Sequence, residues 1–273
     1  MSQKFATIWA AIAALVVFPC SAAEPFEPYE GRAGKDVVWV PTPPALVEKM
    51  LDVARVTPRD FVVDLGSGDG RMVIAAAKRG ARALGVEYDP DMVALSQRNA
   101  AAAGVAGKAT FVQGDMFAAD FSQATVLALF LLPGNLDKLA PKFLQLPAGT
   151  RIVSNAYRIH GWDEAETARP DGYCFTWCTA YLYIVPARVA GAWRLPTGEV
   201  RFTQNFQSLS GTLGYPGGRY VPANGQVKGD QIRFNAGLDV FNGRVRGDEM
   251  SGEASGAYSG FWKAIRIRGQ DRN

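Results

Sequence analysis

Three glycines at alternate positions follow a short apolar stretch that carries an acid. The segment 62–71 reads VVDLGSGDGR. Glycine lets the backbone turn sharply and approach a ligand closely, because no Cβ stands in the way. A helix that starts directly after such a loop presents free backbone N–H groups to the ligand. The segment therefore predicts a ligand-binding loop between a strand and a helix.

The spacing of these glycines does not fit the fingerprint of dinucleotide-binding folds. Counted from Gly66, the pattern G-x-G-x-x-G places its last glycine at position 71, where the sequence has arginine. Asp64 also precedes the loop, and its carboxylate would repel a pyrophosphate. The loop therefore favours a ligand that carries an amino group or a positive charge.

Two further acids follow the next two apolar stretches. Glu87 ends one stretch, and Asp115 follows the other after a single glycine, Gly114, and precedes Met116. A carboxylate at the first position can accept both hydroxyls of a ribose. Asp115 could accept the exocyclic amine of an adenine, with Met116 packed on the base. Each acid alone could be a turn or capping residue, but the series after a glycine loop predicts a nucleoside cofactor.

This combination resembles the class I, seven-stranded S-adenosylmethionine-dependent methyltransferases over residues 37–186. The extended segment VWVPTPP at 38–44 is similar to one branch, the lysine methyltransferases of the ATP-synthase c-subunit and the adenine-nucleotide translocase. The resemblance implies S-adenosylmethionine as cofactor and N-methylation of a protein lysine. The cofactor site that it implies consists of Pro41, Thr42, Asp64, Gly66, Ser67, Gly68, Glu87, Asp115 and Met116.

The segment FLLP at 130–133 occupies the place of the motif that often faces the methyl acceptor. It lacks the Asn or Asp of the N/D-P-P-Y motif, which argues against methylation of a DNA base or a glutamine. No general base is identified, and the acids within 163–166 are more typical of a solvated surface. The candidates for the acceptor side are Phe130, Pro133, His160 and Trp162, although a lone loop histidine is more often an ordinary surface residue.

The composition and the pattern of apolar residues indicate which helices and strands hold these residues. The chain has 273 residues, of which 48% are hydrophobic and 20% charged, which excludes a mainly disordered, collagen-like or coiled-coil protein. Apolar stretches alternate with helical patterns, which predicts a mostly parallel α/β sheet covered on both faces. The resemblance implies that this sheet is Rossmann-like, doubly wound and built of seven strands. We expect strands at 61–65, 83–87, 110–113, 125–132 and 151–156, a β-rich run at 173–185, and helices at 43–54 capped by Thr42, 71–79, 90–103 capped by Asp89, and 136–146.

The composition changes after Pro186. Residues 187–273 are rich in glycine and contain alternating segments separated by turn signals such as Asn224-Gly225 and Asn242-Gly243. They predict a small antiparallel β-domain, a barrel or sandwich of about six to eight strands. This domain carries 12 basic and 7 acidic residues, whereas residues 24–186 carry 16 and 19. Nothing in the sequence assigns a role to it.

The amino terminus has the features of a secretory signal. Lys4 precedes an apolar run at 6–18, and Ser21-Ala22-Ala23 forms a small-residue cleavage site. We expect residues 1–23 to be a cleaved signal peptide, residues 24–36 to be an N-terminal arm, and the mature protein to be periplasmic. The alternative is that residues 6–18 remain as a membrane anchor.

Cysteine and histidine content limits the remaining chemistry. The only histidine excludes a histidine-rich metal centre, and we expect no metal. Cys174 and Cys178 could pair only across a turn, because residues i and i+4 of one strand lie ~13 Å apart. Since the surrounding run is typical of a strand, two small buried side chains are the favoured interpretation.

Three functions are compatible with these patterns. The leading one is methylation of a protein lysine, or of a small-molecule acceptor. The alternatives are an exported S-adenosylmethionine- or nucleoside-binding protein without catalysis, and a ligand-binding protein centred on the β-domain. The net charge of +3 gives no reason to expect a nucleic-acid partner, whereas a membrane-associated acceptor is compatible with export. The oligomeric state is not indicated.

Overall fold

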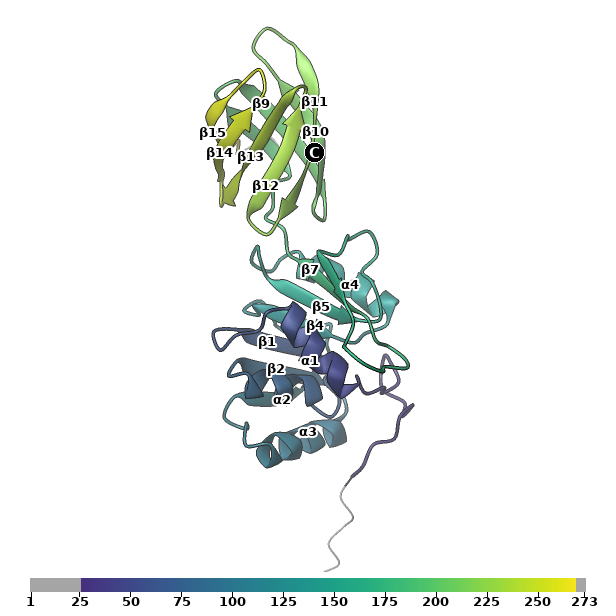
Figure 1. The fold of residues 1–273 in the computed structure, drawn as a ribbon. Helices are drawn as coiled ribbons and strands as arrows, with labels where there is room; N and C mark the ends of the chain where they lie inside the picture. Colours follow the sequence, from purple (N-terminus) through teal and green to yellow (C-terminus); the bar gives the residue numbers. More distant parts are fainter. Residues whose placement is uncertain (1–25, 269–273) are drawn as a thin grey trace, which may run out of the picture.

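The computed structural model describes residues 26–268 and contains an α/β domain followed by a β-barrel (Figure 1). The α/β domain is built on a seven-stranded sheet with the order β3-β2-β1-β4-β5-β7-β6. The first five strands in the chain are parallel, and β7 runs antiparallel to both β5 and β6. The strands are β1 (Phe61–Leu65), β2 (Arg82–Glu87), β3 (Ala109–Gln113), β4 (Val126–Leu129), β5 (Arg151–Asn155), β6 (Glu166–Ala168) and β7 (Ala180–Ile184).

Helices cover both faces of this sheet, so its central strands are apolar on both sides. Val62 packs in one core with α1, α2 and α3, whereas its neighbour Val63 packs in a second core with α4. The alternation follows from the period of two along a strand. The predicted Rossmann-like, doubly wound fold is confirmed. The helices are α1 (Pro44–Val53), α2 (Arg71–Lys78), α3 (Pro90–Ala102) and α4 (Pro133–Phe143).

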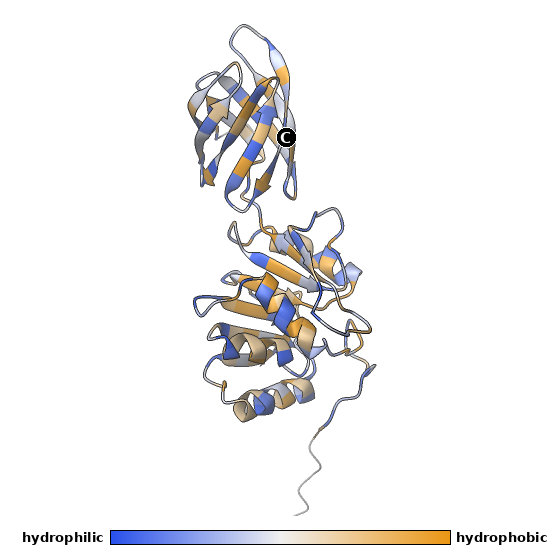
Figure 2. Ribbon diagram, in the orientation of Figure 1, coloured by the Kyte–Doolittle hydropathy of each residue, from blue (hydrophilic) through white to orange (hydrophobic). Residues whose placement is uncertain are grey.

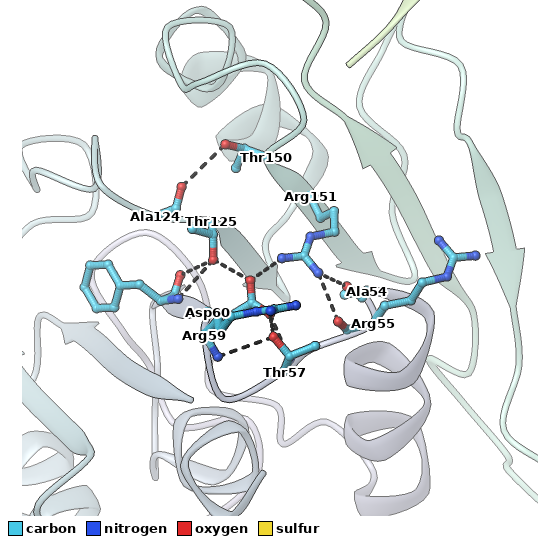
Figure 3. Close-up of polar contacts among 10 residues, drawn as sticks. Ala54, Arg55, Thr57, Arg59, Asp60, Ala124, Thr125, Thr150 and Arg151 are labelled. Carbon is cyan, nitrogen blue, oxygen red and sulfur yellow. Dashed lines mark hydrogen bonds and ion pairs between the residues drawn. The ribbon is translucent and has the colours of Figure 1, made fainter. Parts of the chain in front are cut away.

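A cluster of polar residues lies at the amino-terminal ends of the central parallel strands (Figure 3). Asp60 accepts hydrogen bonds from the Thr57 amide at 2.8 Å and the Thr125 hydroxyl at 2.8 Å, and it pairs with Arg151. Arg151 also donates to the carbonyl of Ala54, just after α1, at 2.7 Å. The cluster therefore joins β1, β4, β5 and α1 at the ends of the strands that lie opposite to the glycine loop.

The starts of three helices can be compared with the predicted ones, and for two of them a capping residue was also predicted. The side chain of Asp89 accepts a hydrogen bond from the Asp91 amide, so the predicted cap of α3 is confirmed. Thr42 does not cap α1, whose N-cap residue is Pro43. Helix α4 begins three residues before the predicted start at 136, because a proline in the first turn has no N–H to lose and Pro133 begins the helix.

The predicted strand 125–132 and the predicted β-rich run 173–185 both contain less strand than expected. β4 ends at Leu129, so residues 130–132 leave the sheet. β7 starts only at Ala180, and the preceding residues form a loop in which Cys174 and Cys178 are joined by a disulfide with a Cα–Cα distance of 5.9 Å. The favoured interpretation of two buried, unpaired cysteines is wrong, because the chain turns between them instead of extending.

Residues 191–266 form a closed barrel of eight antiparallel strands, as the sequence predicted for this region. Hydrophilic and hydrophobic residues alternate along its strands (Figure 2). The inward residues include Trp193, Phe234, Phe241 and Trp262, which are fully buried. The strands are β8 (Gly191–Leu195), β9 (Gly198–Asn205), β10 (Ser208–Gly214), β11 (Tyr220–Lys228), β12 (Gln231–Ala236), β13 (Asp239–Arg246), β14 (Glu249–Ser255) and β15 (Gly260–Arg266).

The barrel interior is packed with aromatic side chains. The rings of Phe234 and Phe241 stack with centroids 4.5 Å apart, and the indole of Trp262 meets both edge-on at 5.7 and 5.6 Å. A small barrel filled in this way has a solid core and differs from the hollow ligand-holding barrels of the lipocalin kind. This packing argues against a ligand-binding protein centred on the barrel.

The predicted signal peptide, residues 1–23, lies outside the described residues. Within residues 26–268 no helix combines the length and the apolar character needed to cross a membrane.

Candidate active site

Two adjoining cavities lie where the carboxyl ends of the parallel strands meet. The order of strands reverses at β1, between β2 and β4, and open α/β sheets bind ligands in the crevice at such a point. The first chamber, of about 180 Å³, is lined by residues 37–42, by the glycine loop and by residues 128–132. The second chamber, of about 90 Å³, is lined by residues 32–37, Glu87 and residues 114–116. Gly66 and Phe130 line both chambers, which therefore form one cleft.

Asp64 is a buried carboxyl group at the carboxyl end of β1. The residue is only 6% exposed and lines the first chamber. Burial, together with the charges of Glu87 and Asp69, raises the pKa of Asp64 to about 8. No donor within residues 26–268 forms a hydrogen bond to its carboxyl oxygens. A buried acid without a donor is suited to a cationic ligand.

The glycine loop has the backbone conformation that its sequence predicts. Gly66, Gly68 and Gly70 all have positive φ, at 76°, 56° and 82°. A Cβ at Gly68 would lie 2.6 Å from Nε1 of Trp39, so a side chain there would collide with the segment that covers the loop. The Ser67 hydroxyl is buried, has no hydrogen-bond partner among the described residues and lines the first chamber. The loop therefore offers close backbone approach to a ligand.

Glu87 and Asp115 lie in the second chamber. One Glu87 carboxylate oxygen accepts the amide of Gly68 at 2.9 Å and the other accepts the amide of Asp89 at 3.0 Å. These bonds fix the Glu87 carboxylate beside the glycine loop, and a carboxylate retains further lone pairs for a ligand. Met116 lies in the same wall and is nearly buried.

Asp115 is engaged by the N-terminal arm. Lys35 Nζ lies 2.6 Å from Oδ2 of Asp115, while Oδ1 accepts the Phe117 amide at 2.8 Å. The hydrogen bond from Lys35 lowers the pKa of Asp115 and raises that of Lys35. A ligand amine at Asp115 would therefore share this carboxylate with Lys35. The sequence did not indicate that the arm forms part of the site.

Pro41 and Thr42 lie in the wall of the first chamber, where Arg71 fixes the segment. Arg71 donates to the carbonyl of Thr42 at 2.9 Å and pairs with Asp69 at 2.6 Å. Arg71 thus joins the segment before α1 to the start of α2. In the sequence Arg71 stands out only as a departure from the dinucleotide fingerprint, and nothing there indicates its contact with Thr42.

Of the four residues predicted for the acceptor side, the structure places only one in the wall of the cleft. Phe130 lies in the cleft wall, while Pro133 begins α4 and does not line either chamber. His160 has a side chain that is 74% exposed and pairs with Asp137 at 2.6 Å. Neither His160 nor Trp162 lines the two chambers.

Trp162 is instead part of the contact between the α/β domain and the barrel. It is 3% exposed, and its ring stacks on that of Phe206 with centroids 5.0 Å apart. Next to it, Gln207 donates to Asp163 at 2.6 Å. The prediction that Trp162 faces the acceptor is corrected, because a residue of the barrel covers it.

Two aromatic residues of the first chamber were missed. Tyr157 follows β5, and Trp177 belongs to the loop closed by the disulfide. Only the aromatic content near the ends of β5 and β7 could have suggested them, since their approach depends on how two loops fold.

Comparisons with known proteins agree with this geometry. The family model described as the ANTKMT methyltransferase domain matches residues 64–166. A protein-lysine N-methyltransferase of Saccharolobus islandicus is 40% identical over 152 residues, which covers 55% of this chain and 94% of the relative. The ATP-synthase c-subunit lysine N-methyltransferase of mouse is 36% identical over 133 residues, which covers 48% of this chain and 54% of that protein. This chain thus spans about half the length of the mouse relative.

A solved structure gives the same fold. It is titled as an RNA methyltransferase from Salinibacter ruber in complex with S-adenosyl-L-homocysteine. It is 44% identical to this chain, covers 55% of it and 96% of its own length, and has a TM-score of 0.51.

The fold, the cleft and these similarities define a class I S-adenosylmethionine-dependent methyltransferase. Within that class the chain belongs to the family of the ANTKMT methyltransferase domain. It is an enzyme whose methyl donor is S-adenosylmethionine, and a cofactor-binding protein without catalysis is not favoured. The match to the family model ends at residue 166, before the barrel begins.

Proposed function

We propose that this enzyme methylates the side-chain amine of a protein lysine. The first chamber carries the proposal, because a wall of apolar and aromatic residues lies beside the glycine loop at which the cofactor would bind. Among the described residues, Arg71 is the only cation of its lining, and its guanidinium is engaged by Asp69 and by the Thr42 carbonyl. The lining thus suits an amine on an aliphatic stem. The name of the Saccharolobus islandicus relative supports the same acceptor.

The residues in the cleft fit S-adenosylmethionine, which supplies an activated methyl group when bound. Asp64, buried without a donor, would pair with the ammonium of the methionine part. Glu87 would accept the ribose hydroxyls, and Asp115 would accept the adenine amine beside Met116. Gly66, Ser67 and Gly68 would supply close backbone contacts, covered by Pro41 and Thr42.

The acceptor side contributes positioning and desolvation. An amine must lose its proton before it can accept a methyl group, and burial in an apolar wall lowers the pKa of an ammonium. Phe130, Leu131 and Leu132 leave the sheet after β4 and supply such a wall. Holding the acceptor in line contributes to the rate without a covalent step on the protein.

An RNA acceptor is a second candidate, because the Salinibacter ruber relative is titled as an RNA methyltransferase. The barrel, with its excess of basic residues, would have to bind the phosphates. Several of these cations are paired within the barrel, among them Arg244 with Asp230 at 2.7 Å and Lys263 with Glu249 at 2.7 Å. The lysine acceptor is therefore preferred.

We further propose that residues 1–23 direct export and that the enzyme acts in the periplasm. The sequence pattern supports this proposal. The disulfide between Cys174 and Cys178 gives independent support, since disulfides persist mainly in oxidising compartments. A membrane-associated acceptor would be accessible there.

One experiment separates the two acceptors. The enzyme is incubated with methyl-labelled S-adenosylmethionine and either the protein or the RNA fraction of the source cells. The protein fraction is used untreated and after chemical blocking of its lysine amines. We expect label as methyl-lysine in the untreated protein and none after blocking. Label that appears only in RNA would contradict the lysine proposal.

A further inference from the structure

Three aromatic rings meet at the first chamber. The ring centroids of Phe130 and Tyr157 lie 6.3 Å apart, those of Phe130 and Trp177 6.0 Å, and those of Tyr157 and Trp177 5.7 Å. These distances are typical of interacting aromatic pairs. All three residues line the chamber, and we call them the aromatic collar. They come from three separate segments, which follow β4, follow β5 and precede β7.

Trp177 is held in the collar by the disulfide loop. Cys174 and Cys178 are joined on either side of it. Trp177 has a φ of 55°, a left-handed conformation that is unfavourable for a bulky residue and requires a restraint from its surroundings. The disulfide supplies such a restraint. Reduction would remove this restraint on the backbone of Trp177.

The other aromatic residues of this loop do not belong to the collar. Tyr173 is 89% exposed and Phe175 is 83% exposed, and their rings contact each other with centroids 6.5 Å apart. Trp177 is 40% exposed, so one side of it meets the collar and the other remains open. The loop therefore offers a matched internal control for the position of Trp177.

The chemistry of the collar suits a lysine side chain. The faces of aromatic rings attract cations and methylated ammonium groups, and flat rings pack along an aliphatic stem. The three collar side chains carry no carboxylate that would hold the amine in its protonated form. The rings would therefore pack along the aliphatic stem of an unbranched amine that enters between them, and they would partly desolvate its nitrogen.

We propose that Trp177 determines acceptor specificity and does so only while the Cys174–Cys178 disulfide is intact. With Phe130 and Tyr157, it binds the stem of the acceptor lysine and directs the amine toward the glycine loop. The inference rests on the proposed function, since it assumes a lysine acceptor. It adds to that function that Trp177 selects the acceptor and that this selection requires the cysteine pair to be oxidised.

The test measures methylation of the protein fraction of the source cells over a range of concentrations, together with S-adenosylmethionine binding by calorimetry. Trp177→Ala should raise the apparent KM for the protein fraction about 10-fold or more, a size expected for a lost cation–π and stem contact. Its cofactor Kd should stay within about 2-fold of wild type. Trp177→Phe should recover most of the loss, and Tyr173→Ala should behave as wild type.

The disulfide is tested separately. The double variant Cys174→Ser/Cys178→Ser should show the raised KM of Trp177→Ala, with thermal unfolding checked to confirm that it is folded. Dithiothreitol should raise the KM of wild type and leave that of the double variant unchanged. A double variant with the wild-type KM would refute the dependence on the disulfide.

Two further outcomes are distinguishable. If Trp177→Ala keeps the wild-type KM, or if Tyr173→Ala loses as much as Trp177→Ala, the collar is not the selecting element. If wild type forms no methyl-lysine at all, the proposed function fails and the role of the collar falls with it.

Discussion

Asp60 and Asp64 stand at the two ends of β1, both nearly buried, and their pKa values move in opposite directions. Burial alone would raise the pKa of Asp60, but hydrogen bonds from Thr125 and Thr57 and the charge of Arg151 lower it. Asp64 has no such donors among the described residues, and its pKa rises to about 8. The first acid is satisfied by donors of the fold, whereas the second has none among the described residues.

Replacing Asp64 by asparagine should stabilise the protein without cofactor at neutral to alkaline pH. The pKa of Asp64 rises from 3.8 to about 8 in the folded chain. The folded state therefore holds a proton that the unfolded chain releases above about pH 4, so stability falls as pH rises toward 8. One unit of pKa corresponds to about 1.4 kcal/mol, so a rise from 3.8 to about 8 sets an upper bound of about 6 kcal/mol on the gain for Asp64→Asn at alkaline pH. Urea unfolding at about pH 4.5 and about pH 8.5, on either side of this range, measures it. A gain that is largest at the lower pH would contradict the assignment.

Binding of S-adenosylmethionine should release a proton from Asp64. The ammonium of the cofactor favours the ionised carboxylate, so affinity should increase between about pH 6 and 8. Calorimetry at about pH 7 in two buffers of different ionisation enthalpy should report close to one proton released. Asp64→Asn should release none and bind about 100-fold more weakly, because a buried charge loses its partner. Equal proton release by the variant would show that another group titrates.

Substitution of Gly68 by alanine should disable the cofactor site. Gly68 has a φ of 56°, and a Cβ there would lie 2.6 Å from Nε1 of Trp39. We expect Gly68→Ala to weaken S-adenosylmethionine binding at least ~10-fold. The control is Gly104→Ala after α3, where φ is 71° but nothing among the described residues lies within 4 Å of the new Cβ. It should cost about 1 kcal/mol of stability and leave binding unchanged. Similar binding by both variants would contradict the crowding argument.

Arg71→Lys should loosen the segment at Pro41 and Thr42. Arginine bonds to the Thr42 carbonyl and Asp69 at the same time, and the single ammonium of lysine does not reproduce that planar fork. We expect S-adenosylmethionine binding to weaken about 10-fold in an equilibrium titration. Arg79→Lys is the matched control, since Arg79 follows the same helix and pairs with Glu48 and Asp52 outside the cleft lining. Arg79→Lys should bind S-adenosylmethionine as tightly as wild type. If it lost as much affinity as Arg71→Lys, a general disturbance of α2 would explain both results, and the contact with Thr42 would not be needed.

The export proposal predicts a defined mature terminus. When the full chain is produced in a bacterium with a secretory pathway, mass spectrometry of the recovered protein should show a start at Glu24. The matched variant is Ala23→Leu, which removes the small residue before the cleavage point and should leave the longer chain uncleaved. A mature protein that retains Lys4 in the unaltered chain would favour the membrane-anchor alternative.

The sequence was sufficient to predict that Asp64, Glu87 and Asp115 lie together along one cleft. Asp64, Glu87 and Asp115 lie at or just after the ends of successive parallel strands, whose carboxyl ends necessarily meet at one edge of a sheet. The position of such residues is set by strand order and needs no knowledge of side-chain packing.

The acceptor half was less predictable, because it depends on contacts between distant segments. Trp162 follows β5 like a site residue, but Phe206 of the barrel covers it. Trp177 lies within a run that is typical of a strand, yet a turn closed by the disulfide brings it to Phe130. Apolar residues 130–132 continue the pattern of β4 although Leu129 is the last to pair with β5.

Closure of the barrel limits how that domain can meet another molecule. Its eight strands pair in a ring, from β10 through β15 and back by way of β8 and β9, so within residues 191–266 no strand presents an edge that is free along its whole length. A partner therefore finds no full-length strand edge to which it could add a strand of its own, the mode in which backbone hydrogen bonds provide most of the affinity. Recognition by the barrel has to use side chains and turns, which makes it dependent on the partner's sequence and leaves the domain resistant to edge-to-edge aggregation.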